Sequence, residues 1–65
     1  MTEEIKIVLA IHNDSALYLF ESFGVTEFVV AYPDGAVKVG DHVSSWFSGH
    51  YFNNLEKALA YLKKR

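Results

Sequence analysis

Three histidines, His12, His42 and His50, are the side chains of this 65-residue chain best suited to proton transfer near neutral pH or to metal binding. A zinc site takes three or four ligands from His, Cys, Asp or Glu, commonly with close pairs along the chain. These histidines are spaced 30 and 8 positions apart, and the chain has no cysteine. Asp14 and Asp41 lie near two of them, but the spacing does not require the groups to converge. We expect no metal site and no cofactor.

Serines near two of these histidines raise a second kind of chemistry, nucleophilic catalysis. Ser44, Ser45 and Ser48 lie close in sequence to His42 and His50. A nucleophilic serine needs an adjacent base inside a pocket. The chain has no Gly-x-Ser-x-Gly sequence and no glycine-rich phosphate loop, and its short length leaves little material for a cleft. We predict that the protein is not an enzyme.

A cluster of aromatic residues is the strongest candidate for a binding surface. Trp46 and Phe52 could be plain core residues, with Phe52 packing at the start of a last helix. Trp and Tyr are also favoured at protein interfaces, and exposed aromatics can stack nucleic-acid bases when cations surround them. No cation lies between Lys38 and Lys57, which disfavours the nucleic-acid interpretation. We predict a partner-binding surface, with Tyr18 and Tyr32 as second choices, formed by Trp46, Phe47, Tyr51 and Phe52.

Positive charge is concentrated at the C-terminal end. Residues 1–54 carry seven acidic residues and two lysines, whereas residues 55–65 carry four cations and one glutamate, for a net charge of −2 overall. Cations in a last helical turn complement the helix dipole. The alternative is that they contact phosphate groups. The possible phosphate contacts are Lys57, Lys63, Lys64 and Arg65.

The composition favours an interaction protein over a self-contained enzyme. About half of the residues (51%) are apolar, ten are aromatic, and the chain carries acidic residues near its start where a secretory signal would be basic. A domain of this size buries only about 60% of the surface of its unfolded chain, so apolar side chains must remain near the surface. The apolar run at residues 7–11 is far shorter than a membrane span of about 20 residues. We expect a cytoplasmic protein that binds no membrane.

The first half of the chain contains one clear element and one ambiguous one. Residues 5–12 alternate as a strand, with Ile5, Ile7, Leu9 and Ile11 on one face. Residues 16–23 fit a helix better, because Asp14 or Ser15 could cap its start and Gly24 could end it. As a strand, residues 16–23 would instead pair back onto residues 5–12 through a tight turn at Asn13-Asp14.

The second half contains a predicted hairpin and a predicted helix. Residues 27–32 and 36–39 flank Pro33-Asp34-Gly35, which is typical of a tight turn. Residues 42–48 could form an edge strand or an ordered loop. Asn53 with Glu56 resembles a capping box. An amphipathic helix follows, whose apolar side is formed by Leu55, Ala58, Leu59 and Leu62.

These elements predict a single α+β domain over residues 1–65. We expect a mostly antiparallel sheet of three or four strands with a C-terminal helix packed across it, in the order β-α-β-β-α. If residues 16–23 form a strand, the fold is instead a β-meander followed by one C-terminal helix. One helix cannot cover both faces of a sheet that is apolar on both sides. We therefore also predict a homodimer that either buries the second sheet face or pairs an edge strand across a two-fold axis. The function predicted is a non-catalytic, regulatory or inhibitory module that occludes or bridges a larger protein partner. The alternative is a nucleic-acid-associated regulator that uses the basic helix.

Overall fold

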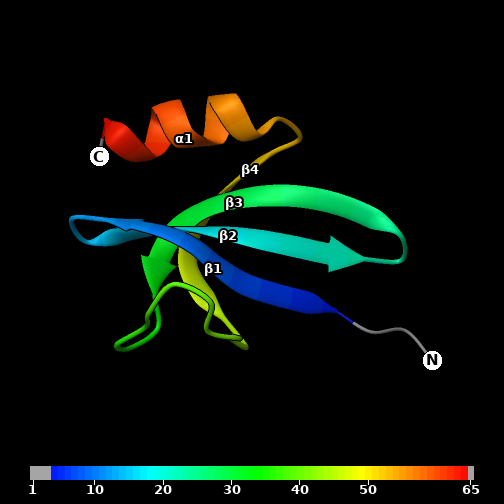
Figure 1. The fold of residues 1–65 in the computed structure, drawn as a ribbon, viewed down its shortest axis with the longest axis horizontal. Helices are drawn as coiled ribbons and strands as arrows, with labels where there is room; N and C mark the ends of the chain where they lie inside the picture. The colour runs from blue at the N-terminus through cyan, green and yellow to red at the C-terminus, as the bar shows by residue number, and fades with distance from the viewer. Residues whose placement is uncertain (1–3, 65) are drawn as a thin grey trace.

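A computed structural model describes residues 4–64 as a four-stranded antiparallel sheet followed by one helix (Figure 1). The strands lie side by side in chain order, β1-β2-β3-β4. The predicted small antiparallel sheet with a C-terminal helix is therefore confirmed. The elements are β1 (Ile5–His12), β2 (Ser15–Ser22), β3 (Val25–Pro33), β4 (Trp46–Phe52) and α1 (Leu55–Lys63).

The helix predicted over residues 16–23 was wrong, because this segment forms β2. The residues expected to cap the helix form hairpin turns instead. Asn13 takes a φ of +55° in the turn that pairs His12 with Ser15, a backbone region that asparagine tolerates. Phe23 and Gly24, with φ values of +54° and +75°, connect β2 to β3. The order is thus β-β-β-β-α, the meander alternative rather than β-α-β-β-α.

The hairpin predicted around Pro33-Asp34-Gly35 was also wrong. β3 pairs with β4, as in the Val30–His50 and Tyr32–Phe47 pairs, and not with residues 36–39. Residues 34–45 form a connection that runs from the end of β3 to the opposite edge of the sheet, where it lies along β1. We refer to this segment as the crossing loop. The strand considered for residues 42–48 begins only at Trp46.

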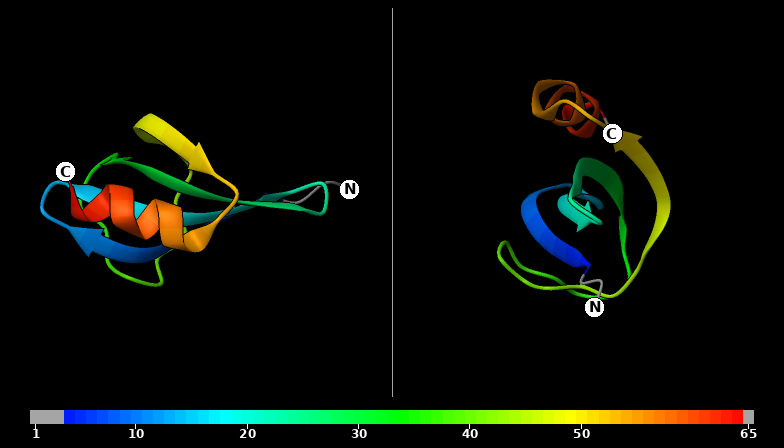
Figure 2. Two further views of the ribbon diagram at one scale, coloured as in Figure 1. Left: turned by 90° about the horizontal axis from the view of Figure 1, so that it is seen from above. Right: turned by 90° about the vertical axis from the view of Figure 1, so that its right-hand side faces the viewer.

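The crossing loop closes the free edge of β1 with backbone hydrogen bonds. The Val8 amide donates to the Asp41 carbonyl at 3.0 Å, and the Gly40 amide donates to the Val8 carbonyl at 2.8 Å. A third bond, from the Val43 amide to the Lys6 carbonyl, measures 2.9 Å. The sheet is thereby curled between α1 and the crossing loop (Figure 2).

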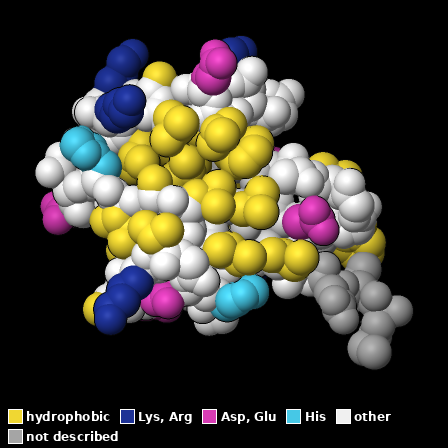
Figure 3. All heavy atoms as spheres, in the orientation of Figure 1, with side chains coloured by type: hydrophobic (Ala, Val, Ile, Leu, Met, Phe, Trp, Pro, Cys, Tyr) yellow, Lys and Arg dark blue, Asp and Glu magenta, His cyan; other side chains and the backbone are white. Residues whose placement is uncertain are grey.

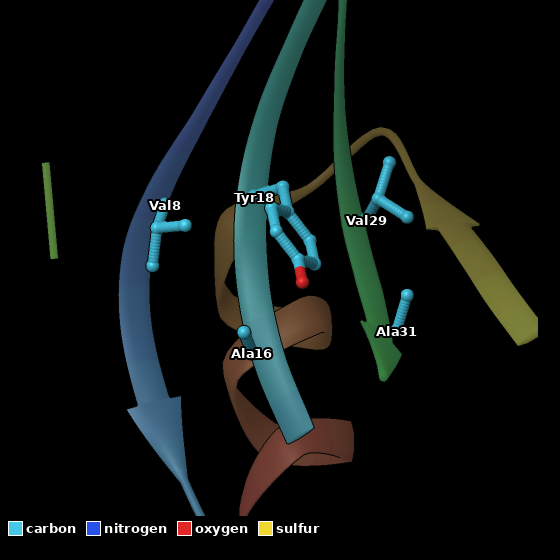
Figure 4. Close-up of a cluster of buried hydrophobic side chains, with 5 residues drawn as sticks. All are labelled: Val8, Ala16, Tyr18, Val29 and Ala31. Atoms are coloured by element: carbon cyan, nitrogen blue, oxygen red, sulfur yellow. The ribbon is translucent and has the colours of Figure 1, made fainter. Parts of the chain in front are cut away.

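A small core lies on each face of the sheet. On the face that we name the helix face, Leu17 and Val30 pack with Ala58 and Leu62 of α1. On the opposite face, named the loop face, Val37 and Val43 of the crossing loop pack at the edge of the second core. The expectation that this second face would be uncovered without a partner was therefore wrong, because the crossing loop packs on it. The loop-face core contains Val8, Ala16, Tyr18, Val29 and Ala31 (Figure 4).

Two β-bulges decide which side chains share a face. In β1 the register shifts between Val8 and Ala10, so Leu9 is an extra residue. Val8 is consequently buried on the loop face, whereas Ala10 packs in the helix-face core. The predicted single face of Ile5, Ile7, Leu9 and Ile11 is broken at this point, and Leu9 and Ile11 are exposed. The second bulge is in β4, where Ser48 has a φ of +56°.

The C-terminal helix begins one residue later than the capping pattern indicated. Asn54, not Asn53, is the N-cap residue, and its Oδ1 accepts a hydrogen bond of 3.2 Å from the Lys57 amide. Ala58 and Leu62 are buried against the sheet. Within residues 4–64, no helix has the length and apolar character needed to cross a membrane.

Candidate interaction surface

Trp46 lies half-buried at the rim of the loop-face core. Its ring centroid is 4.7 Å from that of Tyr18 and 5.7 Å from that of Phe20, which it meets edge-on. Its indole Nε1 donates a hydrogen bond of 3.3 Å to the hydroxyl of Tyr51. The Trp46 side chain therefore packs with the core and also contributes to the rim of the loop face.

The bulge in β4 is what brings Trp46 and Tyr51 together. They are five positions apart in the sequence, so an unbroken strand would place them on opposite faces. The extra residue at Ser48 restores both side chains to the loop face. The indole also lies against Gly49, where an added Cβ would be 2.9 Å from Nε1. Tyr51 itself is 53% exposed.

The other two predicted contact residues lie on the helix face. Phe47 is 58% exposed and pairs across the strands with Tyr32, which is 41% exposed. Phe52 is half-buried, with its ring centroid 5.5 Å from that of Tyr61 in α1. The four predicted residues therefore do not form one continuous surface.

Of the second-choice contact residues, Tyr18 does not reach the surface. It is 0% exposed, at the centre of the loop-face core. Burial raises the pKa of its hydroxyl above the ordinary value of 10.0. Only Tyr32 of the two second choices is accessible to a partner.

Lys6 is a neighbour of the aromatic cluster that sequence reasoning did not include. Its Nζ lies 5.5 Å from the ring centroid of Trp46 and 5.7 Å from that of Phe20, within the range of a cation–π contact. The same ammonium donates to the Ser44 carbonyl at 3.0 Å. The sequence indicated only that Lys6 and Val8 share the mixed face of the first strand. The aromatic partners of Lys6 are Phe20, directly opposite on β2, and Trp46 on β4.

The two edges of the sheet differ in whether they are covered. The crossing loop pairs with β1, whereas no segment within residues 4–64 pairs with the outer edge of β4. Edge strands are commonly protected by charged residues or proline, and the β4 sequence Trp-Phe-Ser-Gly-His-Tyr-Phe has neither. Phe47 and Tyr51 flank this open edge, one on each face of the sheet. The aromatic cluster is thus distributed along an open strand edge.

The candidate catalytic and metal-binding residues are not brought together. His12 ends β1, His42 forms an isolated bridge with Ile7, and His50 has its ring centroid 4.8 Å from that of Tyr61. Across residues 4–64 no group of three or more His, Asp or Glu side chains could hold a metal ion. The Ser45 hydroxyl donates to the Asp34 carboxylate at 2.8 Å.

Two of the open pockets among the described residues are lined by neighbours of the β4 aromatics rather than by the aromatics themselves. The larger has a volume of about 600 Å³ and is lined by Asn13, Asp14, Ser15, Tyr32 and Tyr61. The smaller, of about 230 Å³, lies beside the crossing loop. None of the four predicted contact residues lines either pocket.

The basic residues of α1 lie on its solvent side. Lys57, Lys63 and Lys64 are exposed, while Arg65 lies outside the described residues. Lys57 and Lys64 are seven residues apart and so share one side of the helix, about 10 Å from each other along its axis. They do not adjoin Trp46 or Tyr51, which lie on the loop face.

A comparison with known protein families, curated proteins and solved structures finds no match to this chain.

Proposed function

We propose that this protein is a non-catalytic protein-interaction module of regulatory or inhibitory kind that binds an extended segment of a larger protein along β4. The observation that supports the proposal is the asymmetry of the sheet edges. The crossing loop occupies the β1 edge, while β4 carries unpaired backbone groups, no charge and two exposed aromatic side chains. An open edge of this kind binds partner strands through backbone hydrogen bonds.

The side chains of Phe47 and Tyr51 would provide the specificity. They lie on opposite faces of β4, so a bound strand would contact an aromatic ring on each face. The bulge at Ser48 interrupts regular pairing and limits the continuous stretch that can pair. This limit favours a short segment of a defined partner over indiscriminate stacking of sheets.

The test compares variants of the two exposed aromatics with a matched control. A tagged chain is used to capture proteins from native-host lysate with and without nuclease treatment, and bound proteins are identified by mass spectrometry. We expect one stoichiometric protein to be lost with the Phe47→Ala/Tyr51→Ala double variant. It should be retained with Phe23→Ala, which removes another exposed aromatic at the tip of the β2–β3 turn.

A backbone measurement separates edge binding from contact elsewhere. Hydrogen exchange of the purified complex should show new protection of amides in residues 46–52. Protection confined to the crossing loop or to α1 would contradict the proposal. The nucleic-acid alternative would instead be favoured if nuclease or moderate salt abolished the capture. In that case the Lys57→Glu/Lys64→Glu double variant should abolish it too.

A further inference from the structure

The apolar surface of the helix face extends beyond the part that α1 covers, with Phe28 at the boundary. The helix packs against β2, β3 and β4. Phe28 packs in the helix-face core, and its cross-strand partner Leu19 pairs in turn with Ile7 of β1, so the three share this face. Ile5 lies on the same face two residues before Ile7, and all four side chains are half-buried. We name Ile5, Ile7, Leu19 and Phe28 the open strip.

The space-filling view shows apolar side chains gathered on this side of the molecule, between α1 and β1 (Figure 3). The open strip crosses β1, β2 and β3. Three neighbouring strands span roughly 10 Å, which is close to the diameter of an α-helix with its side chains. The open strip therefore has the width of one further helix.

One flank of α1 borders the open strip. Tyr61 has its ring near His50 and Phe52, so its side of the helix faces β4. At 100° per residue, Glu56 and Lys63 lie on the opposite flank, together with Leu59. Leu59 is half-buried, while Glu56 and Lys63 are exposed. The flank beside the open strip thus carries an apolar centre with opposite charges at its two ends.

When two copies of this helix flank face each other in antiparallel orientation, the acidic end of one lies beside the basic end of the other. We propose that a second copy of this chain covers the open strip across a two-fold axis, with the two α1 helices antiparallel and Leu59 near the axis. Glu56 of each copy then lies beside Lys63 of the other, so that two ion pairs form. A two-fold interface requires this kind of self-complementary surface.

The area that a dimer needs is modest for this chain. A stable interface buries at least about 1,200 Å² in total, or about 600 Å² per copy. That is roughly one seventh of the 4377 Å² surface of the protein. The arrangement leaves the outer edge of β4 uncovered, so it does not rest on the proposed function and can be tested apart from it.

The test is a charge swap read by sedimentation velocity. The wild-type chain should be a dimer at about 100 µM. Glu56→Lys and Lys63→Glu should each weaken the dimer about tenfold, because each places two like-charge pairs at the axis. An equimolar mixture of the two variants should form a heterodimer, and the double variant should dimerise as the wild type does. Lys57→Glu, which changes the net charge as Lys63→Glu does, should leave the dimer unchanged.

Two results would overturn this inference. One is a wild-type chain that remains monomeric up to about 1 mM. The other is a dimer that both charge reversals leave intact but that Phe47→Lys dissociates, because that dimer would be formed through β4. Circular dichroism of each variant establishes that it is folded before its association is measured.

Discussion

The hydroxyl of Tyr18 is a buried polar group without a hydrogen-bond partner among the described residues. Figure 4 shows its ring among Val8, Ala16, Val29 and Ala31. An unsatisfied buried hydroxyl costs about 1–3 kcal/mol. Tyr18→Phe keeps the ring contact with Trp46 and removes that cost, so we predict that the free energy of unfolding rises by about 1 kcal/mol, measured by urea denaturation. A fall in stability would show that an ordered water satisfies the hydroxyl.

The same residue predicts a pH dependence. Burial raises the pKa of Tyr18 above 10.0 in the folded state, so the folded chain holds this proton more tightly than the unfolded chain. The resulting stability is complete below pH 10 and is lost as the pH rises through the folded-state pKa. Between pH 9 and 11 the wild type should therefore lose more stability than Tyr18→Phe, which retains the other three tyrosines. Equal losses would contradict the burial of the hydroxyl.

At the scale of elements, the β4 bulge depends on a residue without a side chain. A Cβ at Gly49 would be 2.9 Å from Trp46 Nε1 and 3.2 Å from the ring of Tyr51. The indole cannot move away freely, because it packs on Tyr18 and Phe20. We predict that Gly49→Ala lowers the free energy of unfolding by about 1–3 kcal/mol and shifts the tryptophan emission. Ser48→Ala provides a control on the same strand, and an unchanged midpoint for Gly49→Ala would show that the indole is mobile.

The β2–β3 turn carries strain that a substitution can relieve. Phe23 has a φ of +54° and is 78% exposed, although left-handed backbone costs a bulky residue about 1–2 kcal/mol. Two-residue turns of this kind favour Asn-Gly, and Gly24 already occupies the second position. Phe23→Asn should therefore raise the free energy of unfolding by about 1 kcal/mol in thermal or chemical denaturation. A loss of stability would indicate that the Phe23 ring packs on the molecule.

The sequence predicts the elements better where one periodicity dominates. β1 and α1 were predictable because their apolar residues repeat at two and at three to four positions. In residues 16–23 almost every position is apolar, and the structure buries Leu17 on one face and Tyr18 on the other. No helical or strand period could distinguish those alternatives. The pairing of β3 with β4 was also hidden, because the local turn signal at Pro33-Asp34-Gly35 says nothing about a partner thirteen or more residues away.

The candidate surface was predictable in composition but not in arrangement. Phe47 and Tyr51 are exposed, whereas Trp46 and Phe52 are half-buried against the two cores, so the structure divides the cluster between the two alternatives that the sequence left open. Their distribution over two faces depends on the bulge at Ser48, and Ser-Gly within an aromatic run gives no unambiguous signal of a bulge. Lys6 was missed for a similar reason, since its ring partners come from β2 and β4.

At the scale of the whole molecule, each face of the sheet is covered by a different device. α1, a regular helix, covers part of the helix face. The loop face is covered by the crossing loop, an irregular segment that few backbone hydrogen bonds hold to β1. The Lys38 amide donates to the Asp41 carboxylate at 2.9 Å, and the Asp41 amide donates to the Lys38 carbonyl at 3.0 Å. This reciprocal pair shapes the part of the loop that pairs with β1. The loop face is therefore the side of the protein expected to open first.

Local opening of the crossing loop can be measured by hydrogen exchange. The amides of Val8 and Val43 are bonded across the loop–β1 contact and become free when the loop lifts. Asp41→Ala removes a carboxylate hydrogen bond worth about 1 kcal/mol, so these two amides should exchange about five- to tenfold faster. Central amides of β2 and β3 should change little, because their ladder bonds do not involve the loop. If all amides accelerate equally, the loop and the sheet unfold as one cooperative unit, and β1 has no separately opening edge.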